Sequence, residues 1–449
     1  MTSEDTLFTG DAEQLRHIRE ARLARTLDRV FDAHSFYRRR FAALNLSRPD
    51  LPDLASLRRL PITTKADFMA EPENFSLGPD GAADLGEHVV WDTMYTTGST
   101  AAPTPFVSTS YDFLNILALN INMLRLRGVT RQDSILNLFP LTKYPHGAFA
   151  RAQHAAAAFG IPVTSALPGQ ASTHRPEIGR RLDEVVALAE RVRPTILWGV
   201  PSYLRTVLSR AEECAARLEQ VRLVFVTGEG FGEASRAALI DSLRRLGATD
   251  PRISISYGAT EMQGGMVECT AGSGYHNPAP DQFLFETVDP DTHEPVADGE
   301  PGLLLLTHLD RRGTTMLRYS LGDVARLTRA RCPHCGALTE RLMTVPFRVD
   351  GLVKIKGMLV NPLVLVDAVT GEAGIADFQA VVSRPTPLSA DRLVIHVVPA
   401  GDGAGLAARL AARVRAAIGV TPDIELVEAN DRVLAERGWK AKPLMDLRK

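Results

Sequence analysis

Cysteine, net charge and long apolar runs are all scarce in this sequence. Four cysteines in 449 residues are too few for a disulfide scaffold. A formal net charge of −2 gives no reason to expect nucleic acid or an anionic membrane as a partner. No apolar run approaches the roughly 20 residues of a membrane-spanning helix, and the polar, acidic residues 1–10 are unlike a secretory signal. We therefore expect a cytoplasmic protein that binds neither membranes nor nucleic acid.

The composition is that of an ordinary globular protein, with 45% hydrophobic and 23% charged residues, and the length favours two or three domains. From residue 134 onward, apolar runs alternate with helical patterns. This alternation predicts an α/β fold in which helices flank a mostly parallel sheet on both faces. The predicted strands are 134–139, 161–164, 195–199, 223–226 and 253–257, and the predicted helices are 148–159, 177–191, 202–217 and 233–246. Cys214, in the third of these helices, is expected to be a small buried hydrophobe.

The segment before residue 134 predicts further helices and two strands. Residues 11–45 carry apolar residues at helical spacing and predict two helices. Thr63 or Thr64 is expected to cap a short helix that begins near Lys65. The remaining predicted elements are strands at 87–95 and 106–108 and a long helix over 111–127.

The chain changes character after the last of the alternating strands. Residues 282–328 are strand-like with Gly, Asp and Pro turns, and they predict a β subdomain over about 265–345. Residues 352–428 then predict strand, helix, strand, strand, helix and strand, which is a compact α+β arrangement. We therefore expect a large N-terminal domain, 1–348, and a small C-terminal domain, 349–449.

One short stretch, Tyr95-Thr96-Thr97-Gly98-Ser99-Thr100, consists almost entirely of hydroxyl residues around a glycine. Glycine permits positive φ and close approach of the backbone, and successive N–H groups in such a turn form a concave site for an anion. Taken alone, the stretch also fits an exposed Ser/Thr-rich loop. Two further polar segments, Thr227-Gly228-Glu229 and Gly258-Ala259-Thr260-Glu261, follow predicted strands, where parallel sheets bind their ligands.

These segments belong to a series of motifs whose order and spacing resemble the adenylate-forming enzymes, the superfamily of acyl-CoA ligases, luciferases and peptide-synthetase adenylation domains. The resemblance covers nearly the whole chain. It is strongest to the phenylacetate–CoA ligase branch, through Leu60-Pro-Ile-Thr-Thr-Lys65, a Cys-x-x-Cys-Gly after Asp323, and the Lys-Ala-Lys-x-x-x-Asp-x-Arg ending. The motifs are, in order, Tyr95-Thr-Thr-Gly-Ser-Thr100, Tyr257-Gly-Ala-Thr-Glu261, Arg318-Tyr-Ser-Leu-Gly-Asp323, Arg348-Val-Asp350, Ile355-Lys-Gly-Met-Leu-Val-Asn-Pro362 and Lys440-Ala-Lys442.

The resemblance implies a nucleotide site. Thr96 to Thr100 would cradle the β- and γ-phosphates of ATP, and Glu261, after Thr260, would hold Mg²⁺, a hard cation that prefers oxygen ligands. Asp323 would accept hydrogen bonds from both ribose hydroxyls, because a carboxylate is only an acceptor, and Arg348 would contact the ribose or a phosphate. The phosphate segment thus includes Thr97, Gly98 and Ser99. The other residues implied at the nucleotide are Ser256, Gly258 and Tyr257, the last near adenine.

The resemblance also implies that the C-terminal domain moves. Lys440 on that domain would stabilise charge on the α-phosphate as the carboxylate attacks, and Lys442 is a close rival for this role. Asp350 would be the hinge about which the domain turns, removing Lys440 and presenting a second face for thioester formation. The alternative for Glu261, Asp323 and Lys440 is that each is an ordinary charged side chain exposed to solvent, with no functional role.

The cysteines form a second constellation. Cys332-Pro-His-Cys335-Gly is a Cys-x-x-Cys knuckle, and His276 follows Cys269 in the chain. Three cysteines and one histidine make a closed tetrahedral zinc site, which is structural rather than catalytic, and the phenylacetate branch resembles this arrangement. The alternative is a set of reduced cysteines in turns. The rival ligands are His293 and His334.

The pocket for the acid substrate is expected between the sheet strands and the nucleotide. Tyr144, His146 and Trp198 favour an aromatic or otherwise flat acid, although such side chains also commonly belong to a core. The other candidate lining residues are Gly147, Pro201, Thr227, Gly228, Ser256 and Met262.

Three functions fit these motifs. The first is an AMP-forming acid–CoA ligase with ATP, Mg²⁺, CoA and structural Zn²⁺ as cofactors, and a homodimer as a further expectation. The second is an adenylating enzyme that passes the activated group to an amine or a carrier-protein thiol, because the sequence shows no dedicated basic patch for CoA. The third is a degenerate nucleotide-binding module, because Ala101 and Trp439 replace glycines that are usual in the family. The complete C-terminal domain and Lys440 favour the first.

Overall fold

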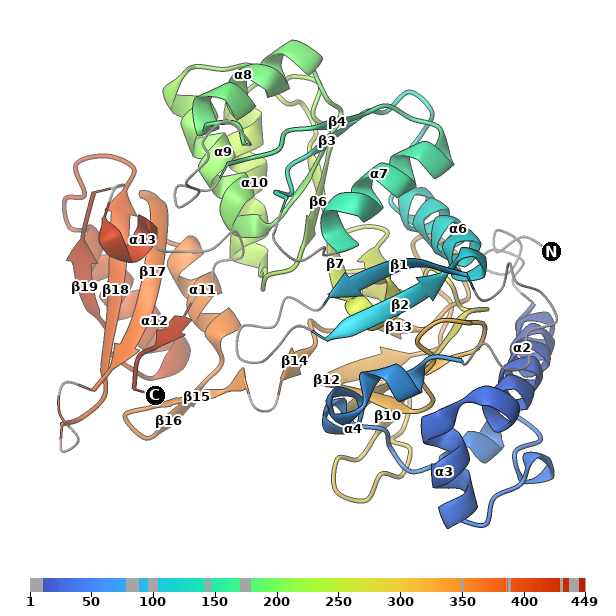
Figure 1. The fold of residues 1–449 in the computed structure, drawn as a ribbon. Coiled ribbons are helices and arrows are strands. Elements are labelled where there is room, and N and C mark those ends of the chain that lie inside the picture. Colours follow the sequence, from blue (N-terminus) through green and yellow to red (C-terminus); the bar gives the residue numbers. More distant parts are fainter. Residues whose placement is uncertain are drawn as a thin grey trace. The chain divides into compact units, whose positions relative to one another are not determined.

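Figure 1 shows the chain as a computed structural model. The described residues are 11–77, 89–95, 104–141, 147–169, 179–348, 351–384, 386, 389–428, 431–435 and 444–448. The chain divides into two compact units. The first comprises Met1–Gln132, Thr142–Ile161 and Ser256–Arg348, and the second comprises Asp133–Leu141, Pro162–Ile255 and Val349–Lys449. Within the described residues, no helix combines the length and the apolar character needed to span a bilayer.

The first unit opens with helices, as the sequence predicted. Residues 11–45 form α2 (Ala12–Ala33) and α3 (Ser35–Ala43). The short helix α4 (Lys65–Ala70) begins where its capping residue placed it. Thr64 and Asp67 form a capping box, in which each side chain accepts a hydrogen bond from the backbone N–H of the other residue. Lys65 is therefore the first residue of a helix whose start is fixed by two hydrogen bonds.

Two antiparallel strands follow, β1 (Val90–Tyr95) and β2 (Pro105–Thr109). β1 ends directly before the hydroxyl-rich segment, which lies outside the described residues. Thr109 and Asp112 form a second capping box at the start of α6 (Ser110–Leu126). The helix α7 (Gly147–Phe159) packs against α6. Both predicted helices are thus present, each within a residue of the predicted boundaries.

Antiparallel strands make up the rest of the first unit. Their order in the sheet is β10 (Phe283–Val288), β11 (Pro301–His308), β12 (Tyr319–Thr328), β13 (Arg341–Leu342), β9 (Tyr275–His276), β8 (Gly264–Glu268) and the end of β7 (Arg252–Ala259). A short strand, β14 (Phe347–Arg348), pairs with β12 and sets Asp323 opposite Arg348. The structure confirms the predicted strand-rich character of 282–328.

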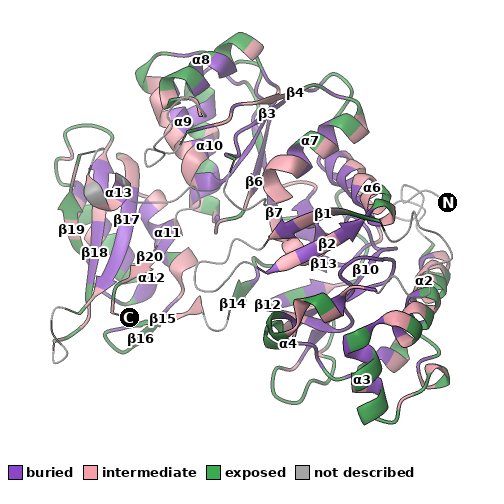
Figure 2. Cartoon of the chain, in the orientation of Figure 1, coloured by how far each residue is buried: buried purple, intermediate pink, exposed green. Residues whose placement is uncertain are grey.

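The second unit has a parallel sheet at its centre. Its strand order is β4 (Val163–Ser165), β3 (Ile135–Asn137), β5 (Ile196–Gly199) and β6 (Leu223–Thr227). The helices that flank these strands are α8 (Leu182–Val192), α9 (Pro201–Glu213) and α10 (Glu233–Arg245). All residues of β3 and β5 are buried (Figure 2), as expected for parallel strands with both faces covered. The chain therefore has the predicted mixed α/β fold, with a parallel-rich sheet flanked by helices.

Two predicted helix boundaries in this region were wrong. α8 begins at Leu182 rather than at residue 177, because Arg180 instead forms a β-bridge with Pro168. α9 ends at Glu213 rather than at residue 217, because Ala215 adopts a left-handed φ of 53°. Cys214 is therefore the C-cap of α9, and its side chain is exposed rather than buried as predicted.

The C-terminal part of the second unit is an α+β body. Its sheet order is β19 (Asp423–Leu426), β18 (Arg392–Pro399), β17 (Ile375–Ser383) and β20 (Leu444–Asp446), and its helices are α11 (Pro362–Thr370), α12 (Leu406–Ile418) and α13 (Arg432–Ala435). The body opens with a hairpin, β15 (Val353–Ile355) and β16 (Met358–Val360), where the sequence predicted one strand. Lys356 and Gly357 take φ values of 48° and 86°, which a two-residue type I′ turn requires.

The Asp-x-Arg ending of the sequence anchors this body. The Arg448 guanidinium donates two hydrogen bonds to Asp446, at 2.8 and 2.6 Å. Its Nη1 also donates to the Lys354 carbonyl oxygen at 2.6 Å and lies 2.8 Å from the Asp391 carboxylate. The carboxylates of Asp446 and Asp391 raise the pKa of Arg448, and the bond to Lys354 joins β20 to the hairpin. The two motif residues are therefore structural ties within the C-terminal body.

Candidate functional site

A tight turn carries Glu261 in the first unit. β7 ends at Ala259, and Thr260–Met262 form a single 3₁₀ turn before the chain returns as β8. Burial raises the pKa of the Glu261 carboxyl, and the positive charges of Lys65 and Arg348 oppose that rise. The turn thus holds a carboxylate whose ionised form needs neighbouring cations.

Asp323 lies in the same unit, on β12. The Tyr257 hydroxyl donates a hydrogen bond of 2.6 Å to Asp323 Oδ2, and Arg348 Nε lies 3.6 Å from Asp323 Oδ1. Burial and the Asp323 charge together raise the pKa of Tyr257 well above its usual value, so the phenol stays protonated and remains a donor. The Asp323 side chain is only 12% exposed, whereas that of Arg348 is 54% exposed. Three separate motifs therefore meet around one oriented carboxylate.

Three residues at this site had no assigned role in the sequence analysis. Lys65, in the Leu60–Lys65 motif, contributes positive charge to Glu261. Burial raises the pKa of the Tyr319 phenol, and the nearby charge of Glu261 raises it further. His308 Nε2 lies 3.0 Å from the Glu261 carbonyl oxygen. Lys65 and Tyr319 carried a sequence signal, because each belongs to a motif noted in the sequence, whereas His308 carried none.

The tautomer of His308 follows from its two contacts. The Met316 backbone N–H donates to His308 Nδ1 at 3.1 Å, so Nδ1 is the acceptor and Nε2 carries the hydrogen. Nε2–H therefore donates to the Glu261 carbonyl oxygen. Burial lowers the pKa of His308 to about 3, so the ring is neutral and serves as a fixed support for the turn.

The Leu60–Lys65 motif reaches this site by joining β12. The Thr63 backbone N–H donates to the Arg318 carbonyl at 3.0 Å, and the Ser320 N–H donates to the Thr63 carbonyl at 2.8 Å. These two bonds form a parallel bridge between Thr63 and Tyr319. The start of α4, and with it Lys65, is consequently fixed beside the strand that carries both Tyr319 and Asp323.

The remaining predicted nucleotide residues are placed as follows. Ser256 is buried on β7, and its hydroxyl accepts a hydrogen bond from the buried Arg127 guanidinium. Gly258 lies on β7 opposite Gly265 of β8. The predicted site residues that lie outside the described residues are Thr96, Thr97, Gly98, Ser99, Thr100, Tyr144, His146, Asp350 and Lys440, together with its rival Lys442.

Four predicted pocket residues belong to the second unit, and one of them, Pro201, is the buried first residue of α9. Trp198 is buried on β5, and its ring meets Phe225 edge to face with centroids 5.4 Å apart. Thr227 ends β6, and Gly228 follows with a φ of 90°, a conformation that favours glycine. Trp198 thus packs within the strand layer, and Thr227 and Gly228 lie at the carboxyl end of a parallel strand.

Cys269, His276, Cys332 and Cys335 come together in the first unit. Their four ligand atoms all lie within 4.8 Å of one another. Cys269 Sγ is 3.9 Å from Cys332 Sγ, and Cys335 Sγ is 3.4 Å from His276 Nε2. A tetrahedral zinc ion with Zn–S bonds of about 2.3 Å implies S···S edges of about 3.8 Å and S···N edges of about 3.6 Å. The spacing of this four-residue cluster therefore fits zinc.

The surroundings of the cluster also suit a metal. His276 Nδ1 lies 3.2 Å from the Val267 carbonyl oxygen, so it donates there and leaves Nε2 facing the thiols. The hydrogen bond with Cys335, and then that with His276, lower the pKa of Cys269, whereas the same bond raises the pKa of Cys335, so a single thiolate is shared within the pair. Two strand pairings assemble the cluster: His276 on β9 pairs with Val267 on β8, shortly before Cys269, and with Arg341 on β13.

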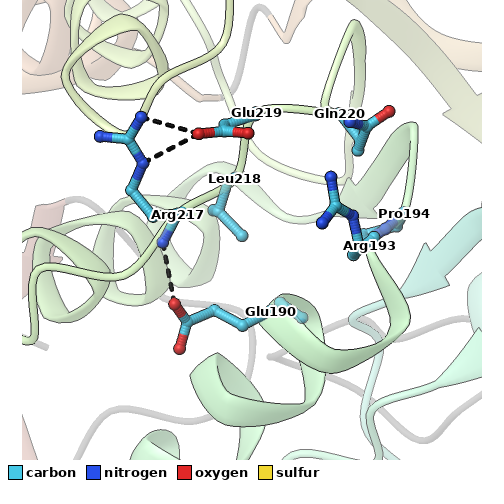
Figure 3. Close-up of a pocket in the computed structure, with 8 residues that line it drawn as sticks. Glu190, Arg193, Pro194, Arg217, Leu218, Glu219 and Gln220 are labelled. Atoms are coloured by element: carbon cyan, nitrogen blue, oxygen red, sulfur yellow. Dashed lines mark hydrogen bonds and ion pairs between the residues drawn. The ribbon is translucent and has the colours of Figure 1, made fainter.

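A small pocket lies elsewhere, in the second unit (Figure 3). Arg217 lines it and donates to Glu219 Oε1 at 2.7 Å, and the Arg217 backbone N–H donates to Glu190 at 2.9 Å. Its volume of about 110 Å³ is below the 300–1,000 Å³ that is typical of small-molecule sites. None of the motif residues lines this pocket, and its charged side chains neutralise one another.

Comparisons with known proteins identify the family and the fold of the chain. The family described as AMP-binding enzyme matches residues 52–310. The phenylacetate-coenzyme A ligase of Thermus thermophilus is 26% identical over 472 aligned residues, covering 100% of both chains. That of Escherichia coli K12 is 27% identical, covering 80% of this chain and 77% of the relative. A crystal structure of 2-hydroxyisobutyryl-CoA ligase in the postadenylation state has the same fold, with a TM-score of 0.80 at 20% identity, covering 99% of this chain and 92% of that chain.

Proposed function

Because this chain belongs to the family of AMP-binding enzymes, we propose that it is an AMP-forming acid–CoA ligase. In the first half-reaction, a carboxylate oxygen of the acid attacks the α-phosphorus of ATP, and pyrophosphate leaves. In the second, the CoA sulfur attacks the acyl carbon, and AMP leaves. The observation that carries the proposal is the convergence of Tyr257, Glu261, Asp323 and Arg348, from three motifs, around one pair of carboxylates. One relative that covers the whole chain and one that covers 80% of it are named phenylacetate-coenzyme A ligase, which supports CoA as the acceptor and an aromatic acid as the substrate.

Asp323 is the proposed ribose ligand. An ionised carboxylate only accepts hydrogen bonds, so it suits the two hydroxyls of a ribose. The Tyr257 hydroxyl and the Arg348 guanidinium hold this carboxylate from two sides. Arg348 is the more exposed partner, which leaves its guanidinium able to contact the ribose or a phosphate as well. In this arrangement Tyr257 orients Asp323 in addition to its proposed place near adenine.

Glu261 is the proposed Mg²⁺ ligand, with Thr260 beside it. Its carboxylate is an oxygen donor of the kind that Mg²⁺ prefers, and its raised pKa indicates that the surrounding charges do not fully offset burial. When bound, Mg²⁺ would neutralise phosphate charge and help pyrophosphate leave. Lys65 supplies a second positive charge at the same carboxylate, and we propose that it also faces the phosphates.

The acid is proposed to be aromatic. The relatives named phenylacetate-coenzyme A ligase act on such an acid by their names. Thr227 and Gly228 lie at the end of a parallel strand, where such sheets bind ligands. Trp198 is proposed to line the pocket without recognising the acid directly, because its ring packs against Phe225. The proposed site further includes Thr96–Thr100 for the phosphates and Tyr144 and His146 for the acid.

The four-residue cluster of Cys269, His276, Cys332 and Cys335 is proposed to hold a structural zinc ion. All four positions of a tetrahedron would be filled by protein, so no place is left for substrate or water. The ion would tie β8 and β9 to the Cys332–Cys335 knuckle. We also propose a cytoplasmic protein that acts on small molecules.

The C-terminal domain, 349–449, is proposed to turn about Asp350 between the two half-reactions. In the structure, Asp367 of α11 accepts hydrogen bonds from the backbone N–H groups of Ala234 and Ser235, at 3.0 and 3.4 Å, in the first turn of α10. The Thr370 and Ser235 hydroxyls add a contact of 2.8 Å. These contacts are polar, which suits a surface that separates and re-forms.

Pyrophosphate release tests the function directly. The purified protein is incubated with Mg²⁺, ATP and a panel of aryl and alkyl acids, and pyrophosphate is measured. We expect release with an aryl acid, and an acyl-CoA plus AMP once CoA is added. Release followed by transfer to an amine or a carrier-protein thiol, with CoA ignored, would contradict the ligase. No release with any acid would indicate a degenerate nucleotide-binding module.

Lys440 gives a sharper test of the first half-reaction. We expect Lys440→Ala to lower the rate of adenylate formation by about 10²-fold, because it removes a charge from the transition state. Lys442→Ala is the matched control, since it removes the same charge two residues away, and we expect a change of less than about threefold. Adenylate formation is measured as pyrophosphate release without CoA. The opposite ranking of the two variants would assign the role to Lys442.

A further inference from the structure

Gln263 directly follows the turn that carries Glu261. It is 3% exposed and has a left-handed φ of 54°. Its backbone N–H donates to the Thr260 carbonyl at 3.0 Å, and its side-chain Nε2 donates to the same oxygen at 2.8 Å. Glycine or asparagine is the usual residue for a left-handed cap, so a glutamine here points to a use for its long side chain.

Arg151 on α7 holds that side chain from the other end. Its Nη2 donates to Gln263 Oε1, and its Nη1 lies 3.0 Å from His154 Nδ1. Because a guanidinium only donates, the oxygen of the Gln263 amide must face Arg151, and the amide nitrogen must face Thr260. The orientation of the amide is thereby fixed by its two neighbours rather than by the turn alone.

Arg151 also meets β1. Its Nη2 lies 3.8 Å from the Asp92 carboxylate, and the Arg151 side chain is only 5% exposed. Burial lowers the pKa of Arg151 to about 10, which still leaves it charged at neutral pH. A buried, charged arginine therefore connects β1, which ends just before the hydroxyl-rich segment Thr96–Thr100, to the turn of Glu261.

We propose that Gln263 and Arg151 are positioning residues that hold the Glu261 turn in the geometry required to bind metal–ATP. This inference rests on the function proposed above. The Glu261 carbonyl is fixed by His308, and the Thr260 carbonyl is fixed by Gln263. With these two of the three carbonyls of the turn occupied, the Glu261 side chain projects from a backbone that does not have to rearrange when metal and nucleotide arrive, which favours binding.

The test uses Gln263→Gly, which removes the side chain while permitting the positive φ. The first readout is binding of Mn²⁺–ATP in the absence of any acid, measured by calorimetry, so that no turnover is involved. The second readout is the Mg²⁺ concentration that gives half-maximal pyrophosphate release. We expect the dissociation constant and the half-saturating Mg²⁺ concentration each to rise about tenfold, because the residues that orient a metal ligand typically contribute about 10- to 100-fold in metal affinity.

Asn45→Gly is the matched control. Asn45 is an exposed residue of the same unit with an almost identical φ of 53°. This substitution relaxes a left-handed residue in the same way but touches no part of the Glu261 turn. In Asn45→Gly we expect unchanged Mn²⁺–ATP binding, unchanged Mg²⁺ dependence and a melting temperature close to the wild type. Gln263→Gly should melt lower, because it leaves a cavity and a buried Arg151 donor without this acceptor, so its binding is measured well below its melting temperature.

Arg151→Lys tests the link between the two side chains. Lysine keeps a charge near Asp92 but lacks the planar fork that serves several acceptors at once. We expect a smaller loss of Mn²⁺–ATP affinity than in Gln263→Gly, and no further loss when the two substitutions are combined, because both act on one chain of bonds. The inference would be overturned, with the proposed function left standing, by either of two results. One is wild-type Mn²⁺–ATP affinity and Mg²⁺ dependence in Gln263→Gly, and the other is full additivity of the two losses of affinity. A wild-type protein that neither binds Mn²⁺–ATP nor releases pyrophosphate would overturn the proposed function itself.

Discussion

Glu261→Gln is expected to lower the rate of pyrophosphate release by about 10³-fold, or about 4 kcal/mol in the activation free energy. Glutamine keeps the size of the side chain and one oxygen but removes the negative charge that a divalent cation requires. The rate is measured at saturating acid and ATP over a range of Mg²⁺ concentrations. Partial recovery at high Mg²⁺ would show that metal affinity accounts for much of the loss.

The same substitution should leave stability unchanged or raise it. Burial raises the pKa of Glu261 in the folded state above its unfolded value, so the folded protein binds this proton more tightly. Its contribution to stability is therefore present below the unfolded pKa and is lost as pH rises through the folded pKa. At neutral pH the wild type bears the cost of a buried charge, which the neutral amide of the variant avoids. The melting temperature of the variant, compared with that of the wild type at acidic and neutral pH, measures this difference.

Glu286→Gln is the matched control. Glu286 on β10 also has its pKa raised by burial, but its partner is Arg318, 3.5 Å away. Its substitution leaves a buried arginine without its ion-pair partner, which destabilises a fold. We expect a lower melting temperature with pyrophosphate release within about threefold of the wild type. A large loss of rate in this variant too would mean that the Glu261 result reflects a general disturbance of the unit.

Local patterns predicted much of what is observed around these residues. The Thr64–Asp67 capping box lies within four consecutive residues, so the start of α4 at Lys65 could be predicted from the sequence. The family resemblance implied that Glu261 and Asp323 belong to one nucleotide site. In the structure both lie in the first unit, and the Asp323 charge contributes to the raised pKa of Glu261, while their roles at a nucleotide stay a prediction. The hairpin at Lys356–Gly357 was missed, because a lysine in a left-handed conformation leaves no clear sequence signal.

Contacts between distant segments could not be predicted in the same way. His308 and Arg151 reach the Glu261 turn from β11 and α7, and neither residue belongs to a motif with a known spacing. Each contact depends on how whole elements pack, which no short window of sequence encodes. The cysteine cluster lies between these cases. The spacing of Cys269 and His276, and of Cys332 and Cys335, could be recognised in the sequence. That the two pairs come together depends on the pairing of β8, β9 and β13.

The second large effect is expected at this cluster. We expect the purified protein to contain one zinc ion per chain, and Cys332→Ser to lose the metal and melt at least about 10 °C lower. Zinc contributes an apparent 10–16 kcal/mol in small zinc-binding peptides, and a loss of only about 4 kcal/mol would lower the melting temperature of a domain of this size by about 10 °C. Metal analysis after dialysis and thermal melting measure the two effects.

Cys214→Ser is the control for the loss of a thiol as such, because Cys214 is exposed at the end of α9 and lies outside the cluster. We expect its zinc content and melting temperature to match the wild type. Thiol titration adds a readout that does not depend on stability, since Cys214 should react at once and the three cluster thiols only after a chelator and a denaturant are added. Zinc well below one per chain in the wild type, or four thiols that react at once, would contradict the site. In either case the knuckle would be held by its own turn, where the Gly336 N–H donates to the Cys332 carbonyl oxygen at 3.0 Å, and not by a metal.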